Sequence, residues 1–440
     1  FRGLGLKPSQ KMGPADYAAF AEEMNLSIAI HPYTEYDEPY FTPECEEAKL
    51  IEHARHKYPD ENPLSSLRKQ FDLNEHEADV DWINLEAFAR GLKVYKEENK
   101  KLDWTDFLEK GWKNAKFPTF KIVLIDEAQD LSKLQWKVVE KISNGVDYLY
   151  IAGDDDQAIY RWAGADIEYF RNLKGEFEFL KQSFRVPRKP FQIAMQIAGR
   201  IHDRYEKEWN PRDEEGEVYY YPSIESVDMD EGKWLILGRT KYLLEECKKI
   251  CRDKGLFYQY FEYPSVKASL CHAIIDWEQW KKGKKKLSYL KIKEIYACMS
   301  VQKKNNPQGK IKWGCKKLDG MTTEHLYTIK ECIKNFGLLT TEPWHDAFDL
   351  IGEDQVRYIR LLLFNGETLT NPPRIKISTI HGAKGSEQDN VVVLLGLTKI
   401  TEESYYKLPD DTHRVFYVAI TRTKKNLHLI DSSTTQEYAI

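Results

Sequence analysis

The 440-residue chain lacks the features that mark a disulfide-rich, zinc-binding or membrane-spanning protein. Its seven cysteines are odd in number and form no CxxC pair, which argues against a disulfide framework or zinc site and for a reducing compartment. No apolar run approaches the roughly 20 residues of a membrane helix, and no signal peptide is visible at the start. We therefore expect a cytoplasmic protein with no membrane partner.

A strong charge of one sign is also missing. The formal net charge is −5, so any nucleic-acid site must arise from a local cluster rather than from the whole chain. Hydrophobic residues make up 42% of the chain and aromatic residues 13%, which is enough to form several cores. The length predicts roughly two to four domains.

The third absence is a phosphate-binding loop of the form GxxxxGK[ST]. Such a loop wraps phosphates in backbone N–H groups and supplies a lysine and a hydroxyl ligand for Mg²⁺. Gly-Lys pairs occur at 232–233, 283–284 and 309–310, but Trp, Lys and Ile follow them instead of Ser or Thr. The chain also begins with Phe1 rather than Met, and we expect it to be a fragment.

Two apolar runs end in acids. "IVLIDEAQD" (122–130) and "YLYIAGDDDQ" (148–157) each predict a buried strand, and the helical pattern between them completes a βαβ unit with parallel strands. Ligands bind at the carboxyl ends of such strands. There Asp126 could hold Mg²⁺ and Glu127 could orient or deprotonate a water. Alternatively, Asp126 caps the next helix and Glu127 lies in its first turn.

The segment after the second run combines amide, aromatic and basic side chains. Gln157 could contact a terminal phosphate and a water at once. Tyr160 and Trp162 could stack on bases, with Arg161 near a phosphate. The alternative is a helix cap formed by one aspartate, followed by aromatic residues of the core.

Four later apolar runs predict further strands, at 233–239, 374–379, 390–396 and 427–430. The chain thus contains two α/β stretches, about 117–182 and about 183–262 joined with 372–440. Residues 11–116 look helical. Residues 263–371 interrupt the second stretch and look helical and basic, with many lysines but a single acid, Glu294, between Trp280 and Lys317.

Five motifs, in order, carry a family resemblance. "LIDEAQD" and "GDDDQAIYRWAGA" resemble motifs II and III of the UvrD/Rep/PcrA group of superfamily 1 helicases. "LKQSFRVP" (180–187), "ISTIHGAKGSEQDNVVVL" (377–394) and "HRVFYVAITRTKKNLHL" (413–429) resemble motifs IV, V and VI. "FRGLGLK", at the start, resembles the tail of an earlier motif. The resemblance covers nearly the whole chain.

The resemblance implies an α/β fold of two RecA-like parallel-sheet domains with inserted helical subdomains, the first RecA-like domain being incomplete. The implied boundaries are 1–10 with 117–182 for the partial first domain (1A), 11–116 for its insert (1B-like), 183–262 with 372–440 for the second domain (2A-like), and 263–371 for a short basic insert (2B-like).

The resemblance also implies an ATP-dependent motor that moves on single-stranded DNA, typically 3′ to 5′, and unwinds duplexes. The implied cofactors are ATP and Mg²⁺, and the implied partners are single-stranded DNA and duplex junctions. The implied nucleotide site comprises Asp126 on Mg²⁺, Glu127 as general base, Gln157 at the γ-phosphate, Arg185 and Arg422 as arginine fingers, Phe184 on the adenine and Glu387 at the sugar. The implied DNA contacts are Tyr160, Arg161, Trp162, Thr379 and His381.

Each of these roles has a plainer alternative. Either arginine could form a surface ion pair, Phe184 could belong to the core, and Glu387 could be a solvated loop acid. A lone histidine such as His381 is usually structural. The lysine-rich 280–317 segment could follow a duplex or could form a solvated helical face.

The chain departs from the family pattern at several positions. Ala163 stands where the family often has Arg, and Ser183 replaces the usual Asn. The family places its phosphate loop ahead of "FRGLGL", so we predict a GxGKT-like loop within about 100 residues upstream of Phe1. A catalytically inactive DNA-binding or regulatory remnant is the alternative function. The motor part of a helicase–nuclease is a third, although no compact acidic cluster follows Arg422.

Overall fold

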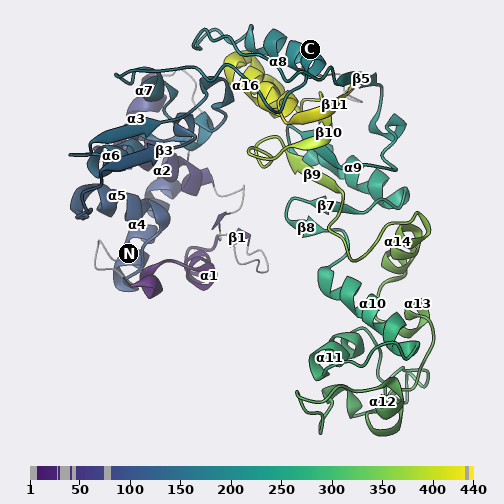
Figure 1. Ribbon diagram of the computed structural model, residues 1–440. Helices are drawn as coiled ribbons and strands as arrows, with labels where there is room; N and C mark the ends of the chain where they lie inside the picture. Colours follow the sequence, from purple (N-terminus) through teal and green to yellow (C-terminus); the bar gives the residue numbers. More distant parts are fainter. Residues whose placement is uncertain (1–6, 27, 30–39, 42–45, 74–80, 432–435) are drawn as a thin grey trace. The chain divides into compact units, whose positions relative to one another are not determined.

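The computed structural model describes residues 7–26, 28–29, 40–41, 46–73, 81–431 and 436–440, which fall into two units (Figure 1). Unit 1 comprises Phe1–Phe179 and Ile201–Glu208, and unit 2 comprises Leu180–Arg200 and Trp209–Ile440. The opening "FRGLGL" lies outside the described residues. No helix in the described part of the chain is both long and apolar enough to cross a membrane.

Helices dominate the first part of unit 1. They are α1 (Pro14–Glu23), α2 (Glu46–Lys57), α3 (Pro63–Leu73), α4 (Trp82–Glu98) and α5 (Trp104–Asn114), accompanied by the short antiparallel pair β1 (Ile28–Ala29) and β2 (Tyr40–Phe41). Phe20, Phe88 and Leu92 lie in their shared core. Over the described residues of 11–116 the expected helical character is confirmed, apart from the β1–β2 pair.

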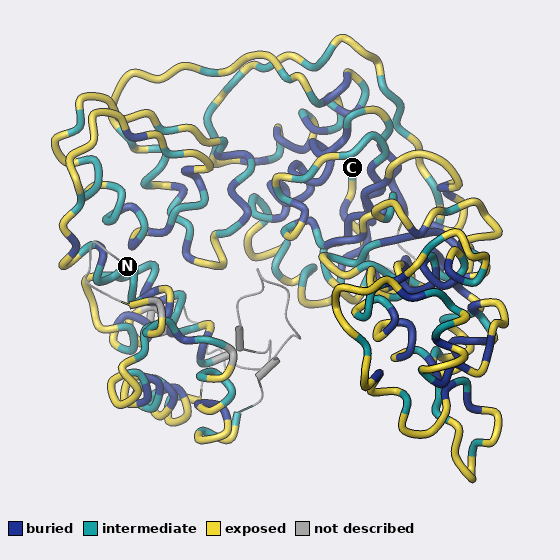
Figure 2. The backbone as a smooth tube through the Cα atoms, turned by 60° about the horizontal axis from the view of Figure 1, so that its bottom comes forward, coloured by how far each residue is buried: buried dark blue, intermediate teal, exposed yellow. Residues whose placement is uncertain are grey.

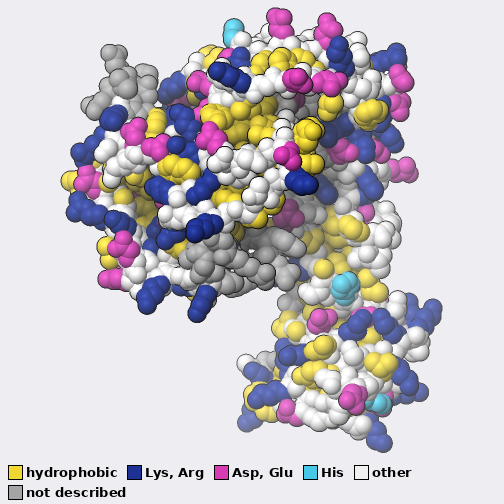
Figure 3. All heavy atoms as spheres, turned by 60° about the vertical axis from the view of Figure 1, so that its left-hand side comes forward, with side chains coloured by type: hydrophobic (Ala, Val, Ile, Leu, Met, Phe, Trp, Pro, Cys, Tyr) yellow, Lys and Arg dark blue, Asp and Glu magenta, His cyan; other side chains and the backbone are white. Residues whose placement is uncertain are grey.

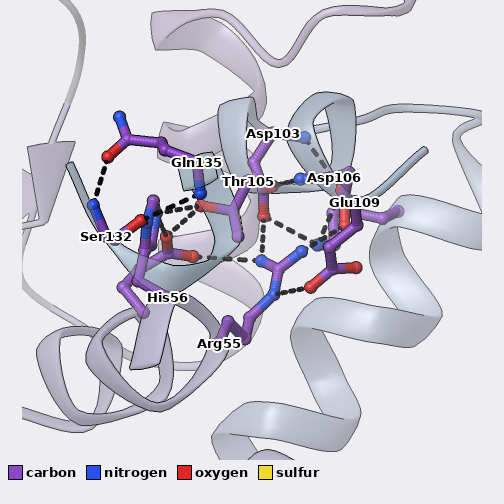
Figure 4. A network of polar contacts seen from close by, with 10 residues as sticks. Arg55, His56, Asp103, Thr105, Asp106, Glu109, Ser132 and Gln135 are labelled. Carbon is purple, nitrogen blue, oxygen red and sulfur yellow. Dashed lines mark hydrogen bonds and ion pairs between the residues drawn. The ribbon is translucent and has the colours of Figure 1, made fainter. Parts of the chain in front are cut away.

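A polar network connects this helical region to the sheet of unit 1 (Figure 4). The Arg55 guanidinium contacts Asp103 at 3.0 Å and Asp106 at 2.6 Å. The neighbouring His56 ring lies 2.8 Å from the Ser132 hydroxyl through Nδ1 and 3.1 Å from the Thr105 hydroxyl through Nε2. Since Ser132 is the N-cap of α6 (Lys133–Ile142), His56 connects α2 to the start of the helix that follows motif II.

The sheet of unit 1 is the predicted βαβ unit. Strand β3 (Ile122–Ile125) leads through α6 to β4 (Tyr148–Ile151), and the strands pair in parallel with Ile122 opposite Tyr148. Helix α6 begins after Ser132, whose hydroxyl accepts from the Gln135 N–H, and it buries Leu134 and Trp136. The short helix α7 (Ile167–Arg171) follows.

The prediction that both strands are buried is wrong. Ile122 is 55% exposed, Leu124 74% and Tyr148 60%, and only Val123 is buried. The apolar pattern correctly located the strands, but burial depends on neighbouring layers. Among the described residues the sheet has two strands only, and nothing covers these side chains.

Unit 2 is built on a seven-stranded sheet with the order β5-β11-β10-β6-β9-β7-β8. Its strands are β5 (Glu217–Tyr221), β6 (Trp234–Gly238), β7 (Tyr258–Tyr260), β8 (Tyr263–Pro264), β9 (Ile375–Thr379), β10 (Gln388–Leu394) and β11 (Thr423–Ile430). All neighbours pair in parallel except β7 and β8, which are antiparallel. Strand β6 is buried along its whole length, and β10 is buried over its last four residues (Figure 2).

The four strands predicted in this region are confirmed as β6, β9, β10 and β11, whereas β5, β7 and β8 were missed. The helices of unit 2 are α8 (Arg188–Ala198), α9 (Lys241–Asp253), α10 (Ala268–Lys281), α11 (Tyr289–Ala297), α12 (Ile329–Asn335), α13 (Trp344–Ala347), α14 (Glu353–Phe364), α15 (Lys399–Lys407) and α16 (Pro409–Ile420). The predicted α/β class, with parallel sheets and many helices, is confirmed.

The segment 263–371 begins with Tyr263 and Pro264, which form β8 of the sheet, and then continues through helices α10–α14. Its assignment as an inserted subdomain stays a prediction. Lys and Arg side chains are spread over the lobe that α10–α13 form at the bottom of Figure 3. Some of these lysines have structural partners. Lys285 and Lys291 lie 2.6 Å and 2.8 Å from the buried carboxylate of Asp276.

Candidate nucleotide and nucleic-acid site

The two acids of motif II stand exposed where β3 ends. The Asp126 carboxylate accepts a hydrogen bond from the Glu127 N–H at 2.9 Å. Glu127 adopts a left-handed backbone conformation with φ of 51°, which turns the chain sharply out of the strand. Helix α6 is capped by Ser132, so the alternative in which Asp126 caps that helix does not apply.

Gln129 joins the ends of the two strands. This residue is fully buried, and its Nε2 donates to Glu127 Oε2 at 2.5 Å. Its Oε1 accepts from the Asp154 N–H, just beyond β4, at 3.0 Å. Gly153 leaves room for this bridge, because a Cβ at that position would lie 2.6 Å from Gln129 Oε1 and 2.8 Å from the Phe170 ring. One side chain thus fixes the carboxylate of motif II against the backbone of motif III.

Gln157 is held by the first acid of motif III. Its Nε2 donates to Asp154 Oδ2 at 2.7 Å. Asp154 also caps the short 3₁₀ turn Asp155–Gln157, because its carboxylate accepts from the Asp156 N–H at 3.2 Å. The alternative in which one aspartate of this segment serves as a cap therefore applies to Asp154. Burial alone would raise the pKa of Asp154, but the Lys207 ammonium and the Gln157 amide hold it below its ordinary value.

The aromatic residues after Gln157 differ in burial. Trp162 is 67% exposed, which excludes the reading that it belongs to the core, and its ring lies 6.3 Å from that of the half-buried Tyr160. The Trp162 carbonyl lies 3.2 Å from His53 Nδ1 on α2. Partial burial, together with nearby Asp130 and Glu127, raises the pKa of Tyr160. Arg161, which stands between these two residues in the sequence, is exposed.

These residues fit a magnesium–nucleotide ligand chemically. Mg²⁺ prefers carboxylate oxygens and retains several waters, and Asp126 and Glu127 offer exposed carboxylates at the carboxyl end of a parallel strand. The buried Gln129 bridge limits the freedom of the Glu127 side chain. Such an arrangement can hold a cation and position a water.

Unit 2 contributes a second group of predicted residues. Arg185 Nε donates to the Glu387 carboxylate, and Lys424 Nζ lies 3.3 Å from its other oxygen. Burial alone would raise the pKa of Glu387, but Arg185 and Lys424 together hold it below its ordinary value. Glu387 is therefore not a lone solvated acid. Phe184 is 85% exposed and is not a core residue.

Arg422 has a different environment from Arg185. It is 2% exposed, and its Nε donates to the Val418 carbonyl of α16 at 3.0 Å. Its own carbonyl accepts from the Gln388 N–H at 3.1 Å. Gln388 is the first residue of β10 and directly follows Glu387 in the sequence. Its role as an arginine finger stays a prediction.

Thr379 is the last residue of β9 and His381 lies two residues beyond it, and the structure adds a residue that the sequence argument did not assign. This residue is Arg239, which directly follows β6. The distance between its NH1 atom and Nδ1 of His381 is 3.3 Å. Burial lowers the pKa of the Arg239 guanidinium, and its buried Nε has no hydrogen-bond partner among the described residues. The signal was an arginine directly after a buried strand, in "WLILGR".

Two family models match the chain. They are the UvrD/REP helicase N-terminal domain, over residues 28–178, and the UvrD-like helicase C-terminal domain, over residues 375–430. The first match contains the strand ends of unit 1, and the second contains Thr379, His381, Glu387 and Arg422.

Curated relatives agree with these models. A probable DNA helicase II homolog of Mycoplasma pneumoniae is 24% identical over 223 residues, which cover 46% of this chain and 31% of that protein. The ATP-dependent DNA helicase PcrA of Bacillus subtilis is 26% identical over 188 residues, covering 39% of this chain and 25% of PcrA. The ATP-dependent DNA helicase PcrA of Staphylococcus aureus is 24% identical over 188 residues, again covering 39% of this chain and 25% of PcrA. The match thus spans less than a third of each relative.

The parallel sheets, the inserted helices and the acids at the strand ends are those of a UvrD-like helicase fold. The chain is UvrD/PcrA-like, since it carries both the N-terminal and the C-terminal domain signatures of that helicase family.

Proposed function

We propose that the protein is an ATP-dependent DNA helicase or translocase that moves 3′ to 5′ on single-stranded DNA and acts at duplex junctions. The observation that carries this proposal is the Gln129 bridge, which ties Glu127 of motif II to the backbone of motif III beside Gln157. A site that had lost its chemistry would have no physical need to fix these side chains together.

In this proposal the described residues divide the nucleotide chemistry among them. Asp126 would hold Mg²⁺, which would supply charge neutralisation at the phosphates. Glu127 would accept a proton from the attacking water, and Gln157 would sense the terminal phosphate. Arg185, kept in place by Glu387, and Arg422 would stabilise negative charge on the transferring group, an effect that can reach about 10³–10⁵ in rate.

DNA would be held by stacking and by local charge. The exposed Trp162 ring offers a stacking surface, and Arg161 offers a phosphate contact. Thr379, His381 and Arg239 would meet the backbone from the carboxyl ends of β9 and β6. Tyr160 is half-buried and would support Trp162.

A second candidate function is a DNA-binding or regulatory remnant without catalysis. The absence of GxxxxGK[ST] from the 440 residues favours it. The presence of Asp126, Glu127, Gln157, Arg185 and Arg422 disfavours it, since a site without catalysis has no evident physical need for these side chains.

The decisive experiment measures ATP hydrolysis by the protein from the full reading frame, with and without single-stranded DNA. We expect DNA to stimulate the rate, and we expect Glu127→Gln to reduce it by about 10²-fold or more, because the amide cannot accept the water proton. Glu140→Gln, on the far end of α6, serves as a control for loss of one acid. Rates at background in the wild type would rule out the motor function.

Polarity and substrate need a separate measurement. Duplexes carrying a 3′ or a 5′ single-stranded tail should be compared under identical conditions, with strand displacement as the readout. We expect displacement from the 3′-tailed duplex only. Equal displacement from both tails, or preference for the 5′ tail, would contradict the proposed direction while leaving the ATPase result intact.

A further inference from the structure

Residues 201–208 form a strap on unit 1, although the residues on either side, Arg200 and Trp209, belong to unit 2. The strap contacts the three consecutive acids of motif III. Arg204 binds Asp156 through Nε at 2.8 Å and NH2 at 2.6 Å, which is a bidentate pair. The Tyr205 N–H donates to Asp155 Oδ2 at 2.7 Å.

Lys207 lies among all three carboxylates. Its Nζ hydrogen-bonds to Asp154, lies 2.5 Å from Asp155 Oδ1 and 3.2 Å from Asp156 Oδ2. Asp155 and Asp156 are 1% and 0% exposed, and the Lys207 side chain is 12% exposed. Oxygens of the three acids lie within 4.8 Å of one another, the spacing of a metal cluster. The cation that fills this cluster is the Lys207 ammonium.

The ion pairs continue to Gln157. Lys207 bonds one oxygen of Asp154, and the other oxygen accepts from Gln157 Nε2 at 2.7 Å. A carboxylate fixed on one side by a buried cation presents its second oxygen in a fixed direction. The orientation of the Gln157 amide therefore depends on Lys207, through Asp154.

We propose that Lys207 is a positioning residue of the nucleotide site, which orients Gln157 through Asp154 without touching the ligand. This inference rests on the proposed function, in which Gln157 senses the terminal phosphate. It predicts that loss of Lys207 lowers the turnover of ATP more than it weakens ATP binding, because a misaligned Gln157 mainly affects the reacting state.

The test compares two buried lysines in the protein from the full reading frame. Lys207→Met removes the charge and keeps most of the side-chain length, and Lys207→Arg restores the charge. Lys96→Met is a matched control, because Lys96 is also 12% exposed and also lies near two aspartates, Asp103 at 2.7 Å and Asp106 at 2.8 Å. Both methionine variants lose a buried cation, but only one acts next to Gln157.

We expect Lys207→Met to lower kcat for DNA-stimulated hydrolysis by about tenfold or more, with KM for ATP changed by about twofold at most. Lys207→Arg should recover most of the rate, and Lys96→Met should keep it. In a Gln157→Ala background, Lys207→Met should cause no further loss, because the two residues act in series. Equal losses in Lys207→Met and Lys96→Met, or additive losses in the double variant, would overturn the proposal.

A second readout does not depend on activity. Hydrogen exchange of the backbone amides at 154–157 should speed up in Lys207→Met and stay unchanged in Lys96→Met. If the wild type hydrolysed no ATP, the proposed function would fail, but this exchange experiment would still decide the role of Lys207. Unchanged exchange at 154–157 in Lys207→Met would show that Lys207 does not hold this turn.

Discussion

At the scale of single residues, one buried amide side chain organises the strand ends of unit 1. Gln129 uses both its donor and its acceptor, one on Glu127 and one on the Asp154 N–H. A buried amide with both groups satisfied stays in one orientation, because any rotation would leave a polar atom unpaired at a cost of about 1–3 kcal/mol. The geometry of the acids is thus fixed before any ligand binds.

Gly153 is a sensitive test of that arrangement. Gly153→Ala would put a Cβ within 2.6 Å of Gln129 Oε1 and 2.8 Å of Phe170, and one of the two must move. We expect a loss of about 1–3 kcal/mol in the free energy of unfolding, measured by urea denaturation. Gly111→Ala, in α5, is the control, because a Cβ there would meet no atom within 4 Å and the backbone φ is not positive. A variant as stable as the wild type would show that the bridge tolerates displacement.

At the scale of secondary-structure elements, β11 carries a buried histidine without a hydrogen-bond partner. Both ring nitrogens of His428 lack partners among the described residues. The centroid of the imidazole ring lies 5.1 Å from that of Tyr219 and 5.8 Å from that of Tyr221, both on β5. It lies 4.9 Å from the ring centroid of Trp234 on β6. No charged group in this set can stabilise the protonated ring, and burial lowers the pKa of His428 to about 4.

This environment predicts an acid-sensitive sheet. The unfolded chain binds a proton on His428 near its ordinary pKa of about 6.5, whereas the folded chain binds it only near 4, so stability falls as pH drops between these values. We expect the loss of unfolding free energy from pH 7 to pH 5 to be about 2 kcal/mol smaller in His428→Leu than in the wild type. Urea unfolding, followed by tryptophan fluorescence at pH 7 and pH 5, measures the free energy of unfolding of the wild type and of His428→Leu. Identical pH dependence would contradict the assignment.

The sequence was informative about elements and less so about contacts. Apolar runs located β6, β9, β10 and β11, because a buried parallel strand needs a continuous apolar segment. They also located β3 and β4, although the side chains of these two strands are largely exposed. The motif "EVYYY" of β5 was missed, since its aromatic residues are partly exposed at an edge of the sheet. Exposure of β3 and β4 could not be inferred, because it depends on which layers surround them.

Site residues followed the same division. Acids directly after strands were found from local sequence, and the structure places them at the strand ends. The Gln129 bridge, the Arg239–His381 contact and the Lys207 cluster were not foreseen. Each of these contacts joins residues that are far apart in the sequence or depends on the orientation of a side chain. A short sequence pattern encodes neither the distant partner nor the orientation.

At the scale of the whole molecule, the proposed function would require DNA affinity to come from a few side chains, because the net charge is mildly negative. Stacking and phosphate contact respond differently to salt, since only the latter releases counterions. We expect Trp162→Ala to weaken single-stranded DNA binding by about 1–3 kcal/mol, with the same salt dependence. Arg161→Gln should instead reduce the slope of log affinity against log salt by about 0.7.

Fluorescence anisotropy of a labelled oligothymidine at several salt concentrations measures both quantities. Trp104→Ala provides a control, since Trp104 is also exposed, at 45%, but lies at the start of α5 and outside the motifs. These assignments would be contradicted if the affinity of Trp162→Ala fell more steeply with salt than that of the wild type. They would also be contradicted if Arg161→Gln left the slope of log affinity against log salt unchanged.

The strap has a consequence for how the protein can be divided. A fragment that ends at Phe179 would leave Asp155 and Asp156 buried without Lys207 and Arg204, and it should fold poorly for that reason. A chimaera that exchanges the first unit between relatives would need to carry residues 201–208 with it. Conversely, a protease cut at 179–180 should leave two pieces that co-purify. The downstream piece contains residues 201–208, which belong to unit 1 and form ion pairs with Asp155 and Asp156 of the upstream piece.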